Sequence, residues 1–318
     1  MSSLLLASDV RRTFGYPHPS SESMTVAWEA MRMLPATLII AVSLVAAGCT
    51  TSSDGPGASD VATTTSVPAT GSAATATPIG PGNVLRVYHD AMDFPTPDEI
   101  AAAQDGKTIV LTFRLGPEAT AAGEHDQQLR EALAQMDAAV GTWLVGYFHE
   151  PEIRLTPDEY RAAFSRVARI VQESAHVRSI AVLMGYTFTA RNPDDWYPGD
   201  DAVDVLGIDG YDWLGCIENG GDGRSDAHPR TFGEIFDPGD AFATAHGKPW
   251  IATEFGRAYV PDDPNARVGW LQDAAAWMDE HPSMIGGAYF QHSLADGYRC
   301  NWALDEQELA VARDLWPE

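Results

Sequence analysis

From Val84 onward the sequence alternates short apolar runs with longer amphipathic stretches, and this alternation most constrains the fold. Such a pattern is typical of parallel strands that are joined by helices. The clearest helix is predicted over 156–175, where Thr156 and Glu159 form a capping box and Pro157 takes the first helical position. Strands are predicted at 84–89, 108–113, 142–148, 179–186, 203–211, 249–255 and 285–291, and further helices at 125–140, 265–281 and 305–316.

Two α/β folds fit this pattern, a TIM (β/α)8-type barrel and an open doubly wound sheet. In an open sheet, the first strand is expected to run into a Gly-rich phosphate loop, and the segment "VYHDAMDFPTP" is not one. In a barrel, polar residues gather at the carboxyl ends of many strands. We predict a barrel over 84–318, because such residues occur at His89, Asp90, Arg114, His149, Glu150, Tyr186, Asp209, Tyr211, Glu254, Gln291 and His292.

Glu150 and Glu254 each follow an apolar strand directly, in "WLVGYFHE" and "PWIATE". At the mouth of a barrel both carboxyl groups are partly desolvated, which raises their affinity for protons. Glycoside hydrolysis uses two carboxyl groups that face each other across a cleft. One protonates the leaving oxygen, and the other attacks the anomeric carbon or directs water. The alternative for either glutamate is a structural ion pair with Arg114 or Arg257.

The segments "HEP" (149–151) and "TEFG" (253–256) resemble the acid/base and nucleophile motifs of the clan A glycoside hydrolases. With "VDVLGIDGYDW" (203–213) and "KPWIATEFG" (248–256), they are most similar to glycoside hydrolase family 26, over roughly residues 84–292. That family consists of retaining enzymes, best known as β-mannanases. The resemblance implies the roles of acid/base for Glu150, nucleophile for Glu254, site orientation for His149 and a hydroxyl that holds the nucleophile for Tyr211.

Two features depart from the family. Mannanases usually follow the acid/base with Met-Asn-Gly, whereas Pro151, Glu152 and Ile153 follow here, so the substrate within the β-glycans stays open. The family also places its acid/base after strand four, and only two strand candidates precede 142–148. The first strand of the barrel is therefore either missing or supplied by a degenerate segment near 74–82.

Further candidates for the substrate site are aromatic and polar residues near strand ends. A flat ring can stack on the apolar face of a sugar. Trp196 is expected to face ligand because it lies in the polar loop "RNPDDWYPGDD", whereas Trp213 and Tyr289 fit stacking or core packing. Four polar side chains could bind sugar hydroxyls or be satisfied by their neighbours, namely His89, Asp90, Arg114 and His292.

Residues 1–48 have the features of an export signal. Arg32 precedes an apolar segment at 34–49 that is long enough for a signal sequence and too short to span a bilayer comfortably. Small residues lead into Cys49, a pattern that resembles a bacterial lipobox and implies lipid attachment to the Cys49 thiol. An ordinary secretory signal is the alternative. Translation is predicted to start at Met31, where such a signal would naturally begin.

Residues 49–83 are predicted to be a disordered tether, because Thr, Ser, Ala, Gly and Pro dominate them. The protein is therefore expected on the extracytoplasmic side of a bacterial cell, as a monomer that meets the membrane only through its anchor, or secreted. In that oxidising compartment Cys216 and Cys300 are expected to form a disulfide in loops at the active face, with two buried thiols as the alternative.

The excess of acidic over basic residues argues against partners that are themselves strongly negative. The chain has 20 Lys and Arg against 45 Asp and Glu, a formal net charge of -25, which repels nucleic acid. A neutral polysaccharide is the expected partner, and no cofactor is expected.

Two other classes of function stay open. A metal-dependent hydrolase could use His89, Asp90, His149, Glu150 and His292, although the sequence has no H-x-H or H-E-x-x-H motif. A barrel that binds carbohydrate without cleaving it is the other. The prediction that fits the paired glutamates is a retaining, endo-acting hydrolase of β-linked polysaccharide, such as β-mannan.

Overall fold

The computed structural model describes residues 80–214, 216, 228–260, 262–291, 293–294 and 300–317, all within one compact unit, Ala69–Glu318. Predictions for the signal region, Cys49 and the tether up to residue 79 lie outside the described residues. Seven strands follow one another along the chain: β1 (Val84–His89), β2 (Thr108–Phe113), β3 (Thr142–Tyr147), β4 (Val177–Met184), β5 (Val205–Asp212), β6 (Trp250–Arg257) and β7 (Met284–Tyr289). Each predicted strand is confirmed to within two residues at either end.

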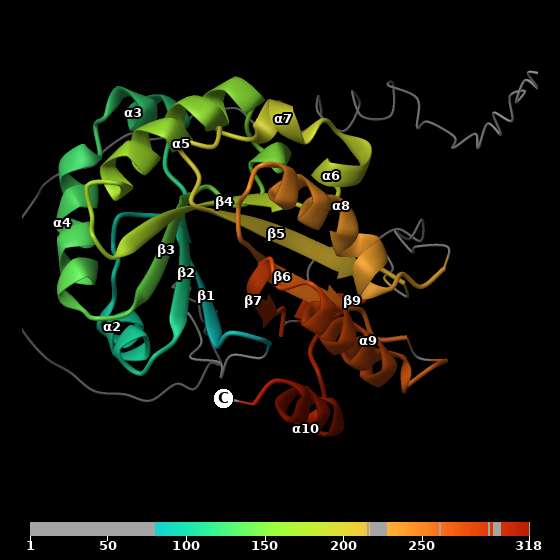
Figure 1. Ribbon diagram of the computed structural model, residues 1–318. Coiled ribbons are helices and arrows are strands. Elements are labelled where there is room, and N and C mark those ends of the chain that lie inside the picture. The colour runs from blue at the N-terminus through green and yellow to red at the C-terminus, as the bar shows by residue number, and fades with distance from the viewer. Residues whose placement is uncertain are drawn as a thin grey trace, which may run out of the picture. The chain divides into compact units, whose positions relative to one another are not determined.

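The helices connect these strands and surround them (Figure 1). They are α2 (Pro97–Gln104), α3 (Pro117–Ala122), α4 (Asp126–Ala138), η1 (Pro151–Ile153), α5 (Pro157–Val171), α6 (Thr187–Ala190), α7 (Pro193–Trp196), α8 (Phe232–Ala245), α9 (Ala266–Glu280) and α10 (Glu306–Leu315). The predicted capping box of Thr156 and Glu159 starts α5. Sequence reasoning did not predict α8, which contains Pro238 and begins at a further capping box, of Thr231 and Glu234. Within the described part of the chain, no helix has both the length and the apolar character to cross a membrane.

All seven strands are parallel, and each pairs with the next in chain order. The two ends of this sheet approach each other, because the Gly287 N–H of β7 donates to the Pro81 carbonyl oxygen (2.8 Å), just before β1. The sheet is thus a nearly closed TIM-type barrel. Residues 80–83 lie beside β7 without forming a strand, so the first strand of an eight-stranded barrel is missing or degenerate over the described residues.

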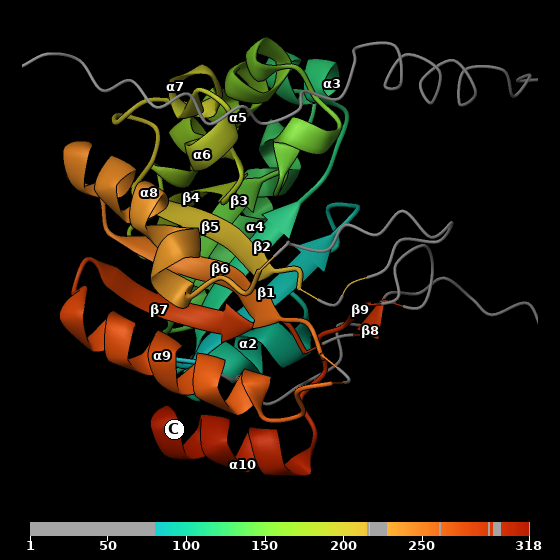
Figure 2. The same cartoon turned by 90° about the vertical axis from the view of Figure 1, so that its right-hand side faces the viewer.

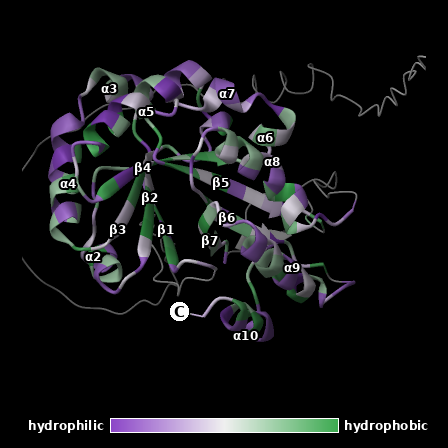
Figure 3. Ribbon diagram, viewed as in Figure 1, coloured by the Kyte–Doolittle hydropathy of each residue, from purple (hydrophilic) through white to green (hydrophobic). Residues whose placement is uncertain are grey.

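Two apolar layers hold the barrel together. Its interior is filled by small and branched residues from alternate positions of the strands, Val84, Val110, Leu144, Ile180, Val182, Val205, Ile251 and Ala288. A larger cluster packs the outer faces of the strands against the helices. Figure 3 shows the apolar colour concentrated on the strands and the polar colour on the outer helices. Burial on both faces explains why the strands read as continuous apolar runs.

The strands point to one side of the barrel, and the short antiparallel pair β8 (Ser293–Leu294) and β9 (Cys300–Asn301) lies on that side (Figure 2). The carboxyl ends of β1 to β7 therefore gather the polar residues predicted at strand ends.

Candidate active site

Glu150 lies in an unusual turn at the carboxyl end of β3. Phe148 and Glu150 both have positive φ angles, 55° and 46°, which non-glycine residues rarely adopt. The Phe148 N–H donates to the Phe113 carbonyl oxygen on β2 (2.9 Å), and the Glu150 N–H donates to the Val182 carbonyl oxygen on β4 (3.2 Å). Pro151 then begins η1. The turn is thus held to both neighbouring strands, which offsets its backbone strain and fixes Glu150 at the barrel mouth.

The carboxyl group of Glu150 is strongly perturbed. Burial raises its pKa to about 8, and the negative charges of Glu254 and Glu152 act in the same direction. The positive charges of Arg86 and Arg114 oppose this shift. At neutral pH the Glu150 carboxyl group is therefore mainly protonated, the state that a proton donor needs.

Glu254 lies inside β6, at a β-bulge. Ile208 of β5 is opposite Ala252, but Asp209 is opposite Glu254, so β6 has one extra residue at this point. Its register with β7 shifts over the same stretch. Bulges re-aim side chains and are frequent next to active sites.

The bulge brings two successive side chains of β6 to the same face. The hydroxyl of Thr253 donates to Asp209, and the carboxylate of Glu254 accepts a hydrogen bond from Tyr88. In a regular strand, neighbouring side chains point to opposite faces. Glu254 therefore reaches the barrel interior only because the strand is bulged.

Two tyrosine hydroxyls hold the carboxylate of Glu254. Tyr88, from β1, donates to Oε1, and Tyr211, from β5, donates to Oε2. Burial, followed by the charge of Glu254, raises the pKa of both tyrosines well above the ordinary value, so both stay protonated and act as donors. The Tyr88 ring is 38% exposed and borders the open mouth, whereas its hydroxyl lies against Glu254. These two contacts fix the position of the carboxylate.

Asp209 is a third acidic residue of the site. It is 3% exposed, and burial, followed by the charges of Glu254 and Glu150, raises its pKa. Its Oδ1 accepts from Thr253, while its Oδ2 has no partner among the described residues. Burial thus disfavours a second negative charge at Asp209.

His149 is a neutral residue that lies next to Glu150 in the chain and packs against Tyr88. Its Nδ1 is 3.1 Å from the Thr112 hydroxyl, and its ring meets the Tyr88 ring edge-on at a centroid distance of 4.8 Å. Burial lowers the pKa of His149 to about 2, and the charges of Arg86, Arg114 and Arg154 lower it as well. The imidazole thus packs against Tyr88 without adding charge, consistent with an orienting part.

Arg86 lies below Tyr88 on the interior face of β1. Its guanidinium is 4.2 Å from the centre of the Tyr88 ring, and its Nη1 donates to the carbonyl oxygens of Val87 (3.0 Å) and Val110 (3.2 Å). Its Nε and Nη2 are buried without a partner within the described residues. Gly146 and Gly207 lie in the barrel interior at positions where a Cβ would meet neighbouring strands.

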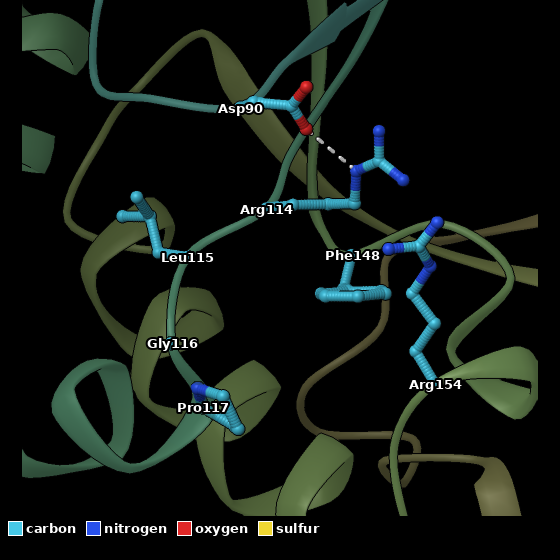
Figure 4. A pocket seen from close by; sticks show the side chains of 7 residues that line it. All are labelled: Asp90, Arg114, Leu115, Gly116, Pro117, Phe148 and Arg154. Carbon is cyan, nitrogen blue, oxygen red and sulfur yellow. Dashed lines mark hydrogen bonds and ion pairs between the residues drawn. The ribbon is translucent and has the colours of Figure 1, made fainter. Parts of the chain in front are cut away.

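An open pocket lies next to Glu150 at the same end of the barrel (Figure 4). It has a volume of about 730 Å³ and is lined by Asp90, Arg114, Leu115, Gly116, Pro117, Phe148 and Arg154. The Nε of Arg114 donates to Asp90 (2.9 Å). Asp90 and Arg114 therefore satisfy each other in part, and both lie at the site as their sequence positions predicted.

Other predicted residues of the substrate site lie differently. The expectation that Trp196 faces ligand is corrected, because Trp196 is 6% exposed and its ring centre lies 6.5 Å from that of Tyr160 on α5. The loop is polar, but its short helix α7 turns the indole into the core. Tyr289 is 7% exposed and donates to the Trp302 carbonyl oxygen at 3.0 Å, which favours core packing over stacking.

His89 is also used within the protein. Its two ring nitrogens lie 2.8 Å from Asp93 and 2.8 Å from Glu99, so its neighbours satisfy it. Trp213 is half-buried and packs against Tyr211 and Trp302, with ring centres 5.8 Å and 5.2 Å away.

The remaining candidates are incompletely described. His292 lies outside the described residues. Cys216 is buried with Ala258 and Trp302, and the backbone of Cys300 pairs with Leu294. The side chain of Cys300 lies outside the described residues, so its disulfide with Cys216 stays a prediction.

Sequence reasoning did not single out Tyr88, Arg86 or Asp209 for roles in the site. A signal for the first two exists, because 84, 86 and 88 share one face of β1 and Val84 belongs to the barrel interior. An arginine and a tyrosine at such inward positions indicate a polar layer inside the barrel. Among the described residues, no group of three or more His, Cys, Asp or Glu side chains is arranged to hold a metal ion.

No family model matches the chain, and no curated protein matches it. Solved structures do resemble it. The structure of a fungal β-1,4-galactanase matches with a TM-score of 0.51 at 12% identity, over 73% of this chain and 87% of that one. This likeness shows the fold, a TIM-type barrel.

Two further solved structures resemble the chain with TM-scores below 0.5. A Cellulomonas fimi endo-β-1,4-mannanase double mutant has a TM-score of 0.46 at 18% identity over 68% of this chain, which spans 56% of that protein. The Pseudomonas stutzeri endoglucanase Cel5A has a TM-score of 0.46 at 16% identity, over 73% of this chain and 81% of its own.

Proposed function

We propose that this protein is a retaining glycoside hydrolase that cleaves a β-linked polysaccharide by double displacement. The observation that supports this most directly is the contrast between two carboxyl groups at one end of the barrel. The pKa of Glu150 is raised to about 8, whereas two tyrosines donate to the carboxylate of Glu254. A carboxyl group that keeps its proton suits the role of the acid, and a carboxylate held in place by two hydroxyl donors suits the role of the nucleophile.

In the first step, the Glu254 carboxylate attacks the anomeric carbon while Glu150 gives its proton to the leaving glycosidic oxygen. The product is a covalent glycosyl ester of Glu254 and a Glu150 carboxylate. In the second step, Glu150 takes a proton from water, the water oxygen attacks the anomeric carbon, and Glu254 leaves as a carboxylate. Tyr88 and Tyr211 orient the carboxylate of Glu254 for attack, and their hydroxyl groups stabilise the negative charge when it returns to Glu254.

The proposed substrate is a β-linked glycan such as β-mannan, cleaved internally. The matching fungal β-1,4-galactanase shares the fold, and the pocket beside Glu150 is open to solvent. We also propose that the protein is a monomer held at the cell surface through Cys49.

The test is release of reducing ends from β-mannan, mixed-linkage glucan, xylan and bacterial envelope glycans. Glu150→Ala and Glu254→Ala should each abolish release, whereas Glu280→Gln, at an exposed site on α9, should not change it. NMR of the first product should show retained anomeric configuration.

Three outcomes would overturn the proposal. Release that survives Glu254→Ala would exclude Glu254 as the nucleophile. Binding of a glycan without release would indicate a carbohydrate-binding barrel. Loss of activity with a chelator would indicate a metal-dependent hydrolase.

A further inference from the structure

The pocket beside Glu150 is positively charged, in contrast to the whole molecule. Its lining contains two arginines and one acidic residue, Arg114, Arg154 and Asp90, whereas the chain has a formal net charge of -25. Scattered surface arginines are ordinary. Here two of them, Arg114 after β2 and Arg154 after η1, line the same pocket.

Both guanidinium groups keep donors free for a ligand. Arg114 gives its Nε to Asp90 (2.9 Å) and leaves its Nη groups available. Arg154 is exposed, and its side chain has no hydrogen bond or ion pair to any residue of the described part of the chain. Figure 4 shows the two guanidinium groups turned toward each other on one side of the Phe148 ring.

Phe148 gives the pocket an apolar floor. Its ring is 8% exposed, and its backbone has the positive φ of the strained turn that also positions Glu150. The residue that forms the floor is thus two positions from the proposed acid/base. A sugar ring in the pocket can meet the partly exposed apolar side chains of Leu115 and Pro117 while its edge faces the two arginines.

We propose that this pocket binds an acidic sugar unit of the substrate, through a carboxylate or another oxyanion held by Arg114 and Arg154. Guanidinium groups pair with carboxylates, sulfates and phosphates through two parallel hydrogen bonds, so the shared chemistry is a planar or tetrahedral oxyanion. The inference rests on the proposed function and narrows it, because it replaces the neutral polysaccharide expected from net charge with a β-glycan that has anionic units next to the cleavage site.

Binding can be tested separately from cleavage by calorimetry on the full chain. The probes are glucuronate-bearing β-xylan, β-glucan and β-mannan oligosaccharides, and the same oligosaccharides after reduction of each carboxylate to a neutral hydroxymethyl group. We expect at least one acidic oligosaccharide to bind about tenfold or more tightly than its reduced form. Sulfated and phosphorylated versions of the same oligosaccharides distinguish the three oxyanions.

Three variants assign the effect to the pocket. Arg154→Ala and Arg114→Ala should each remove most of the preference for the acidic form. Arg178→Ala is the matched control, because it removes one exposed positive charge at the start of β4, the opposite end of the barrel. Circular dichroism checks that Arg114→Ala, which also breaks the contact with Asp90, still folds.

The inference is overturned if no acidic form of any oligosaccharide in the panel binds more tightly than its reduced form, or if Arg178→Ala lowers the preference as much as Arg154→Ala. Cleavage of a neutral glycan without any preference would leave the proposed hydrolase standing and exclude the anionic subsite. Preferential binding of an acidic oligosaccharide without cleavage would support the anionic subsite and contradict the proposed hydrolase.

Discussion

At the scale of single residues, the site works by giving chemically similar groups different surroundings. Glu150 is half-buried next to other acidic residues, and its pKa rises to about 8. Glu254 is held in place by two hydroxyl donors, Tyr88 and Tyr211. In the proposed mechanism, these surroundings suit Glu150 to the role of proton donor and Glu254 to that of nucleophile.

The pH dependence should follow the proton on Glu150. Because a general acid works in its protonated form, kcat/KM should be high below about pH 8 and fall as pH rises through the raised pKa of Glu150. Glu150→Gln should remove this alkaline limb on an aryl glycoside whose leaving group needs no proton. Stopped assays between pH 5 and pH 10 measure both profiles, and an alkaline limb that persists in Glu150→Gln would contradict the assignment.

The two tyrosines should matter for turnover more than for binding. A hydrogen bond to a charged group contributes about 1.5–3 kcal/mol, so Tyr88→Phe or Tyr211→Phe should each lower kcat about tenfold to a hundredfold, with little change in KM. Tyr160→Phe is the control, because the buried Tyr160 hydroxyl on α5 has no partner among the described residues. Equal losses in all three variants would indicate a general folding defect.

At the scale of elements, the strands are shaped around the site. The bulge in β6 turns Glu254 inward, and the turn after β3 holds Glu150 to both neighbouring strands. Glycines in the barrel interior keep space open where other side chains would clash. Gly146 on β3 is the clearest case, because a Cβ there would lie 2.4 Å from the Ile180 carbonyl oxygen of β4.

Gly146→Ala should therefore destabilise the fold. The clash involves backbone, which cannot rotate away, and overpacking of this kind typically costs about 1–3 kcal/mol. Gly269→Ala, in α9, is the matched control, because a Cβ there meets nothing within 4 Å and alanine favours helix by about 0.5–1 kcal/mol. Urea denaturation should show a lower free energy of unfolding for Gly146→Ala and a higher one for Gly269→Ala. An unchanged free energy of unfolding in Gly146→Ala would contradict the packing described.

At the scale of the whole molecule, the carboxyl-terminal helix is fastened to the barrel by a buried ion pair. Arg267 on α9 donates from Nε to Glu308 Oε1 of α10 (2.8 Å) and from Nη2 to Oε2 (2.5 Å), and from Nη1 to the Ala303 carbonyl oxygen (2.8 Å). Both partners are at most 3% exposed. Glu308 also accepts from the Asp305 N–H in the capping box of α10.

Glu308→Gln should destabilise the protein strongly, because it leaves a buried guanidinium without its charge partner. Loss of one partner of a buried pair typically costs about 3–5 kcal/mol. Asp158→Asn breaks the exposed pair with Arg161 and should cost less than about 1 kcal/mol. Thermal unfolding compares the stability of the two variants. Similar losses of stability in Glu308→Gln and Asp158→Asn would contradict a larger contribution from the buried ion pair.

The sequence by itself determined the order and kind of the main elements. All seven strands and the helices at α4, α5, α9 and α10 follow from apolar runs, helical periodicity and the capping box at Thr156, which are local signals. The placement of Glu150 and Glu254 toward the same end of the barrel also follows, because parallel strands in a barrel share one carboxyl end.

Only the tertiary structure decided which side chains meet. Tyr88 is 166 residues from Glu254 along the chain, and no local pattern announces that contact. The bulge at Glu254 depends on register with two neighbouring strands, and the burial of Trp196 depends on where α7 packs against α5. Local sequence sets the propensity of each segment, whereas contacts between distant segments depend on how the whole chain packs.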